Sequence, residues 1–118
     1  MMVSLPTSVR IWLAAQATDL RKSFDSLAEL VRQQLQADPL SGQLFVFRNK
    51  RADRVKLLYW DEDGFVIVYK RLEAGTFRFP AAQAAGVEIR AADLQMLLDG
   101  VDLASVKRGR RYRRPMPA

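Results

Sequence analysis

The stretch QLFVFRNKRADRVKLLYWDEDGFVIVYKR, from Gln43 to Arg71, decides the fold. Its three apolar runs, rich in the β-branched and aromatic residues that favour strands, occupy 43–48, 54–60 and 65–71. Two short polar connections separate the runs, and Gly64 at the end of the second can adopt the positive φ that many hairpin turns need. Connections this short join antiparallel neighbours. The stretch therefore predicts an antiparallel meander.

A fourth short apolar run follows the meander at Thr76 to Phe79, after a connection that contains Gly75. We expect it to add one more antiparallel strand. Eight aromatic residues lie in these four runs, and we expect them to serve core packing and cross-strand pairs rather than base stacking. They are Phe45, Phe47, Tyr59, Trp60, Phe65, Tyr69, Phe77 and Phe79.

Upstream of the meander, apolar residues recur at spacings of four, three, four and four, which places them on one stripe of a helix. They are Leu20, Phe24, Leu27, Val31 and Leu35. Thr18 or Ser23 could cap the first turn, and Ser23 is preferred because Asp25 then suits the positive helix end. Asp38-Pro39 stops the helix, since the residue before proline is driven out of the helical region. We expect a helix ending near Gln36 that packs on one side of the sheet.

Both ends of the chain add one element to this plan. The segment Val9 to Ala14 alternates in the manner of a short N-terminal strand, and a short helix is expected from about Ala91 to Asp99, with Gly100 stopping it in a left-handed conformation. The prediction is a single α+β domain over residues 1–106: a short strand, an amphipathic helix on an antiparallel meander, and a short C-terminal helix. Residues 107–118 form a basic tail.

The composition matches a globular chain, with 49% hydrophobic and 27% charged residues among 118. No apolar run approaches the ~20 residues that a membrane helix needs, and no secretory signal opens the chain, so we expect a cytoplasmic protein. Cysteine and histidine are both absent. Their absence excludes Cys/His zinc sites, thiol catalysis and histidine-dependent triads, and we expect no enzyme activity, no metal and no cofactor.

The formal charge of +6 is concentrated at the C-terminus. Residues 107–118 contain six basic and no acidic residues, so residues 1–106 carry 13 of each and are formally neutral. The basic residues of the tail are Lys107, Arg108, Arg110, Arg111, Arg113 and Arg114. A block of like charges with Tyr112 among them suits contact with a nucleic-acid backbone, and the alternative is a disordered end that keeps the protein soluble.

Several separated motifs occur in a fixed order along the chain. They are TDLRKSFD at 18–25, DPLSGQLFVFR at 38–48, DRVK at 53–56, WD at 60–61 with Gly64, KRLEAGTF at 70–77 and LLDGVD at 97–102. In these motifs the chain resembles the Orf-two-like accessory proteins, also called TnpB, of the insertion-sequence family numbered sixty-six. It does not resemble the RNA-guided nuclease that shares this name.

The resemblance implies a helper in the transposition of a bacterial insertion sequence, encoded beside a larger transposase that carries the chemistry and beside a second small accessory protein. Both are the implied protein partners, and DNA is an expected one. The resemblance supplies no catalytic residues.

Two further groups of polar residues are candidate sites. The first-hairpin cluster is Arg48, Lys50, Arg51, Arg54 and Lys56. It could neutralise DNA phosphates, or it could be a solvated loop that keeps a sheet edge soluble. The second group, Thr18, Asp19, Arg21 and Lys22, either forms a partner-binding surface or braces its own loop. The acidic run Asp61-Glu62-Asp63 is expected to be a charged turn rather than a metal site.

Three functions remain possible from the sequence. The first is a non-catalytic module that helps to assemble a transposase–DNA complex through electrostatic contact with DNA. The second is a protein-interaction adaptor for the transposase that does not touch DNA. The third, a metal-dependent nuclease, requires carboxylates that meet in space, which one sequence cannot show.

Overall fold

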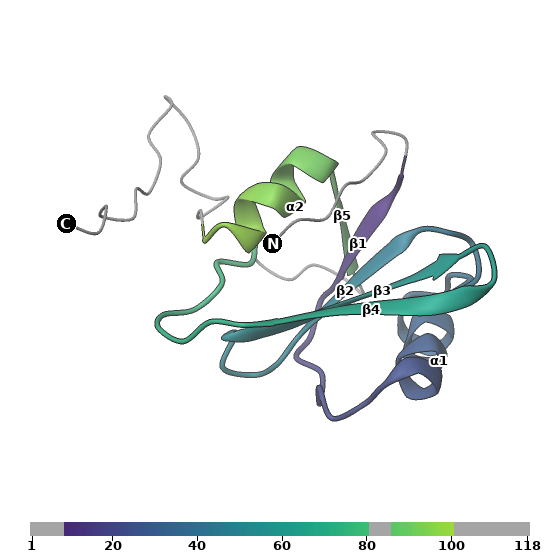
Figure 1. Cartoon of the computed structure of the whole chain (residues 1–118), viewed down its shortest axis with the longest axis horizontal. Coiled ribbons are helices and arrows are strands. Elements are labelled where there is room, and N and C mark those ends of the chain that lie inside the picture. Colours follow the sequence, from purple (N-terminus) through teal and green to yellow (C-terminus); the bar gives the residue numbers. More distant parts are fainter. Residues whose placement is uncertain (1–8, 81–85, 101–118) are drawn as a thin grey trace.

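Five strands form one sheet between two helices in the computed structural model, which describes residues 9–80 and 86–100 (Figure 1). The elements are β1 (Ile11–Ala14), α1 (Phe24–Gln34), β2 (Leu44–Arg48), β3 (Arg54–Asp61), β4 (Gly64–Arg71), β5 (Gly86–Ile89) and α2 (Ala91–Leu98). The α+β class is confirmed. No helix in these two ranges is long and apolar enough to cross a membrane.

The central meander forms as predicted. Strand β2 pairs antiparallel with β3, and β3 pairs antiparallel with β4 along its whole length, from Arg54 opposite Arg71 to Asp61 opposite Gly64. The acidic run lies in the tight β3–β4 turn, where Glu62 has a φ of 56°. Local pairing between runs joined by short turns explains why the sequence was sufficient here.

The sheet is mixed rather than purely antiparallel, which corrects the prediction. Its strand order is β4-β3-β2-β1-β5, with β1 parallel to β2 and β5 antiparallel to β1. Adjacent parallel strands need a crossover connection, and α1 supplies it. Strand β5, which the sequence did not predict, has only four residues and depends on pairing with β1 from the other end of the chain.

The prediction of a strand at Thr76 to Phe79 is wrong. This segment is not part of any strand, and the backbone N–H of Phe77 donates instead to the carbonyl of Ala52 in the β2–β3 turn (2.7 Å). The Phe77 side chain is buried in the core. The segment therefore buries the Phe77 side chain and pairs its backbone N–H without joining the sheet. From periodicity alone, such a segment cannot be distinguished from a short strand.

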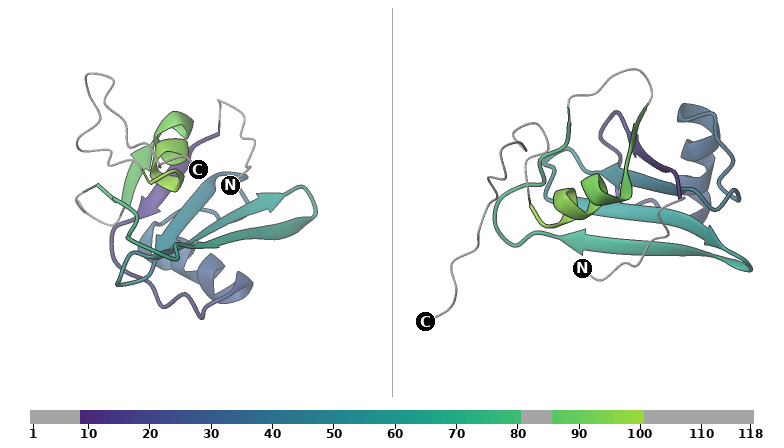
Figure 2. Two further views of the ribbon diagram at one scale, coloured as in Figure 1. Left: turned by 60° about the vertical axis from the view of Figure 1, so that its left-hand side comes forward. Right: turned by 90° about the horizontal axis from the view of Figure 1, so that it is seen from above.

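The two helices lie on opposite faces of the sheet (Figure 2). Alternate residues of the strands supply one hydrophobic core on each face. On one face α1 packs Leu27, Ala28 and Val31 with Phe45, Phe47 and Leu58. On the other face α2 packs Leu94, Leu97 and Leu98 against a core that includes Leu13, Val46 and Leu57. The predicted packing of α1 on the sheet holds for Leu27 and Val31. Of the other residues of the predicted stripe, Leu35 lies beyond the helix and is only partly buried, and Phe24 is 45% exposed.

The ends of the two helices differ in how well they were predicted. Ser23 occupies the N-cap position of α1 as expected, with its backbone N–H donating to the Ser26 hydroxyl (3.1 Å), and Gly100 has the expected positive φ, 83°. However, α1 ends at Gln34, because Gln36 adopts a left-handed conformation (φ 50°) and the Ala37 N–H donates to the Val31 carbonyl (3.2 Å). The chain thus leaves the helix before Asp38-Pro39 would force it out. The predicted tail, 107–118, lies outside the described residues.

Candidate nucleic-acid interface

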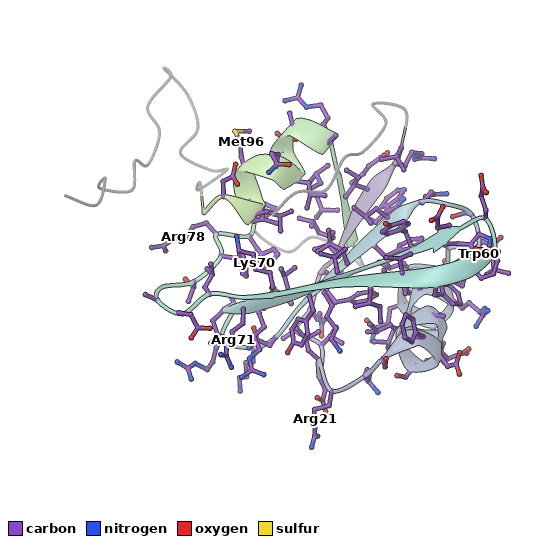
Figure 3. The ribbon with its side chains drawn as sticks, viewed as in Figure 1. Arg21, Trp60, Lys70, Arg71, Arg78 and Met96 are labelled. Carbon is purple, nitrogen blue, oxygen red and sulfur yellow. The ribbon has the colours of Figure 1, made fainter. Side chains whose placement is uncertain are left out.

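An open groove of about 540 Å³ lies where the β1–α1 connection passes the β2–β3 turn. We call it the basic groove and define it by Thr18, Asp19, Arg21, Lys50, Arg51, Asp53, Arg54 and Tyr69. A second hollow of about 390 Å³, lined by Arg54, Tyr69, Arg71 and Glu73, adjoins it through the two shared residues Arg54 and Tyr69, and we count it as part of the basic groove. Figure 3 shows that Arg21 and Arg71 both project on the α1 side of the sheet, whereas Lys70 and Arg78 lie on the α2 side.

The groove joins the two candidate groups that lie about thirty positions apart in the sequence. The Thr18 N–H donates to the Arg48 carbonyl (2.7 Å), and the Lys56 ammonium donates to the Lys22 carbonyl (2.7 Å). These two bonds fix the β1–α1 connection to strands β2 and β3. Thr18, Asp19 and Arg21 of the loop therefore form one surface with Lys50, Arg51 and Arg54 of the hairpin, which the sequence did not reveal. Lys22, Arg48 and Lys56 do not line it.

Two of the five first-hairpin cations are engaged inside the fold. Lys56 is only 8% exposed, and its ammonium also lies 4.7 Å from the centre of the Tyr69 ring. The Arg48 guanidinium donates to the carbonyls of Ala15 and Asn49 (3.4 Å each) and lies 5.6 Å from the Phe79 ring centre. Lys56 therefore braces the groove from inside. The Arg48 side chain instead lines a separate small hollow with Phe79 and Pro80, on the face of the sheet that α2 covers. Neither side chain is placed to reach a phosphate at the groove.

The bracing role of Lys56 predicts that replacing it with methionine lowers stability. Methionine has a similar length but cannot donate to the Lys22 carbonyl, so a charge-assisted hydrogen bond is lost. We expect the free energy of unfolding to fall by about 1 to 3 kcal/mol, measured by urea denaturation. The matched control is Lys50→Met on the exposed turn, expected within about 0.5 kcal/mol of the parent. Equal midpoints for both variants would rule out the bracing role.

The other three hairpin cations, Lys50, Arg51 and Arg54, are exposed and make no ion pair within residues 9–80 and 86–100. The β2–β3 turn, which carries Lys50 and Arg51 and ends at Arg54, is held by its own hydrogen bonds. Asn49 donates to the Asp53 carboxylate (2.6 Å), and its side-chain oxygen accepts from the Arg54 N–H (3.0 Å). The Asn49 bond lowers the pKa of Asp53, so this carboxylate stays ionised beside the cations.

The loop side of the groove is braced by one local ion pair. The Asp19 carboxylate accepts hydrogen bonds from the Arg21 guanidinium, the shortest 2.6 Å, and another from the Arg21 backbone N–H (3.0 Å). These bonds hold the pKa of Asp19 well below its usual range. The Arg21 side chain is nevertheless 91% exposed, so it is oriented by Asp19 while its outer surface faces solvent.

Sequence reasoning missed Tyr69 and Arg71 as groove residues. Tyr69 was expected in the core, but it is 48% exposed. Its register partner is Lys56, on the face covered by α1, and its position along β4 lies beyond the residues that α1 buries. Arg71 pairs with Glu73 (2.9 Å) and stands directly opposite Arg54. The alternation along β4 predicts that Tyr69 and Arg71 share one face of the sheet. The sequence does not show how much of that face α1 covers.

The carboxylates of the described residues do not gather. Across 9–80 and 86–100, no group of three or more acidic side chains is close enough to hold a metal ion. Asp19, Asp53 and Glu73 at the groove each engage an arginine or asparagine side chain instead.

Comparisons with known proteins place this chain in a family. A family model described as IS66 Orf2-like protein matches residues 9–108. The uncharacterized protein y4jC of Sinorhizobium fredii is 37% identical over 107 residues, which cover 91% of this chain and 92% of that protein. The uncharacterized protein y4hO of the same organism is 40% identical over 95 residues, covering 80% and 83%. No solved structure matches.

Proposed function

The chain belongs to the IS66 Orf2-like protein family, and from this premise we propose that it is a non-catalytic accessory protein that aids assembly of a transposase–DNA complex. The family supports a role associated with transposition. The contact with DNA is our inference, and it rests on one observation: three exposed cations without ion-pair partners in the described ranges stand at the basic groove, two on the β2–β3 turn and one at the start of β3.

Such a cluster suits the phosphate backbone for a physical reason. Each phosphate neutralised by a lysine or arginine releases condensed counterions, and this release supplies most of the affinity of sequence-independent binding. Lys50 and Arg51 project from the turn, and Arg54 begins the adjacent strand. Contacts of this kind position a protein on DNA without reading bases. This matches a helper role better than a role in recognising a specific site.

The basic tail supports the same proposal from the sequence alone. It carries six positive charges and accounts for the whole net charge of the chain. We therefore propose that the tail and the basic groove both contact DNA, with the larger contribution from the tail.

Salt titration of duplex binding tests this proposal. If all six tail charges neutralise phosphates, they contribute up to about −5 to the slope of log affinity against log salt. Deleting residues 107–118 should flatten the slope by that amount, measured by fluorescence anisotropy on a duplex of arbitrary sequence. A scrambled-sequence duplex is the control and should bind equally well. If deletion leaves both affinity and slope unchanged, the tail has no role in DNA binding.

The alternative is an adaptor that binds the transposase or the second small accessory protein without touching DNA. The mixed charge of the groove favours it, because Asp19, Asp53 and Glu73 stand among the cations as they would at a polar protein interface. Co-purification of the three element-encoded proteins, with and without terminal DNA, separates the two functions. Retention of this chain by the transposase, together with no salt-dependent DNA binding by the isolated protein, would favour the adaptor.

A further inference from the structure

We propose that the basic groove binds single-stranded DNA, with one unpaired base stacked on the ring of Tyr69 and the flanking phosphates held by Lys50, Arg51, Arg54 and Arg71. This inference rests on the proposed DNA contact and adds the form of DNA that the groove takes. It assigns to Tyr69 a role different from core packing.

The Tyr69 ring has the properties of a stacking platform. About half of the residue is exposed (48%), and it lines both hollows. Its position is fixed from two directions, since the Lys56 ammonium lies 4.7 Å from the ring centre and Arg54 donates to its hydroxyl (3.3 Å). A ring fixed before binding loses little conformational entropy when a base stacks on it. Stacking on an aromatic ring tolerates any base, because every base has a π-face.

The charges around the ring leave a place for an anion. Arg54 and Arg71 are direct cross-strand partners on β3 and β4, and like charges in such positions repel each other. Glu73 pairs with Arg71, whereas Arg54 makes no ion pair within the described part of the chain. A phosphate beside Arg54 and Arg71 would offset this repulsion. Lys50 and Arg51 stand at the other hollow, so cations lie in both hollows that the ring lines.

The position of the ring favours a single strand over a duplex. Tyr69 lies on β4, the edge strand of the sheet within the described residues, and lines the groove beside the β1–α1 connection. The faces of a base inside a duplex are covered by its neighbours, so stacking on a protein ring requires an unpaired or flipped nucleotide. The phosphates of a duplex can still reach the outer cations. The groove should therefore bind both forms of DNA, but only a single strand should use the ring.

Replacing Tyr69 with leucine tests the stacking contact in the full-length chain. We expect affinity for a 12-nucleotide single strand to fall about fivefold to 100-fold, the usual loss for one stacked base. Affinity for the matching duplex should change less than twofold. The salt slope should stay the same for both, since no charge is removed. Tyr69→Phe keeps the ring and should retain most single-strand affinity. Phe24→Leu is the matched control, because it removes an exposed aromatic ring on α1 outside the groove.

A spectroscopic readout distinguishes stacking from a loss of fold. A single strand with one 2-aminopurine should lose fluorescence on binding to the parent and to Tyr69→Phe, and should lose less on binding to Tyr69→Leu at saturation. Thymidine monophosphate should compete for the groove better than inorganic phosphate. Equal competition by the two, or equal quenching by all variants, would overturn the stacking proposal. Parent protein that binds neither single strand nor duplex would instead overturn the proposed DNA contact itself.

Discussion

Replacing Lys50, Arg51 and Arg54 together with glutamine should weaken duplex binding by about two orders of magnitude at ~0.1 M salt. Each phosphate contact contributes about 0.9 to the log–log salt slope, so three contacts contribute up to about 2.7. Losing them should flatten the slope by that amount, which salt titration by fluorescence anisotropy measures. Glutamine removes the charge of these exposed side chains and, at Arg54, also the hydrogen bond to the Tyr69 hydroxyl. The three side chains are exposed and belong to neither core, so the fold should be unaffected.

A charge-matched control makes this result specific to the groove. Arg10, Arg32 and Arg90 are also exposed, but each pairs with an acid outside the groove: Glu88, Glu29 and Asp93. Changing these three to glutamine removes the same three charges. Affinity should then fall only by the small amount that the change in net charge produces. Equal losses in the two triple variants would mean that the groove contributes no localised contact.

Replacing Leu27 with alanine should lower the free energy of unfolding by about 2 to 5 kcal/mol, the range for a fully buried leucine that leaves a cavity. Leu27 is fully buried and packs in the core that joins α1 to the sheet, with Phe45, Phe47 and Leu58. The variant loses apolar contacts with these three neighbours. They are fixed by the strands that carry them, so they cannot move enough to fill the cavity. Urea denaturation monitored by circular dichroism measures the loss.

Phe24 provides the control for this prediction, because it belongs to the same apolar stripe and lies one turn away on α1. It is 45% exposed, so Phe24→Ala should cost less than about 1 kcal/mol. The two variants together test which part of the stripe faces the sheet. Similar losses for both would contradict the packing of α1 through Leu27 onto the sheet.

Local patterns in the sequence were sufficient where structure depends on neighbours in the chain. The β2–β3–β4 meander follows from runs of strand-forming residues joined by short turns, and α1 follows from its apolar stripe and from the cap at Ser23. The end of α2 follows from Gly100, whose missing Cβ permits the left-handed conformation that closes the helix. The family motifs are also legible in the sequence, and they indicate the process, transposition, in which the protein takes part.

Long-range pairing had to be supplied by the tertiary structure. Residues Gly86–Ile89 form a strand because they pair with β1. The apolar run at Thr76 to Phe79 does not form one, because the Phe77 N–H donates to the Ala52 carbonyl in the β2–β3 turn instead. The parallel register of β1 and β2 likewise depends on where α1 packs, since the helix forms the crossover between them.

The candidate site divides in the same way. Its residue types were visible in the sequence as two charged groups and an aromatic strand. Only the fold decided that Lys56 is buried against Tyr69 while Lys50, Arg51 and Arg54 stay exposed, and that the β1–α1 connection lies beside the β2–β3 turn. The physical reason is that exposure depends on which distant segment covers a side chain. Residue type and local periodicity set which face a side chain occupies, and tertiary packing sets whether that face is covered.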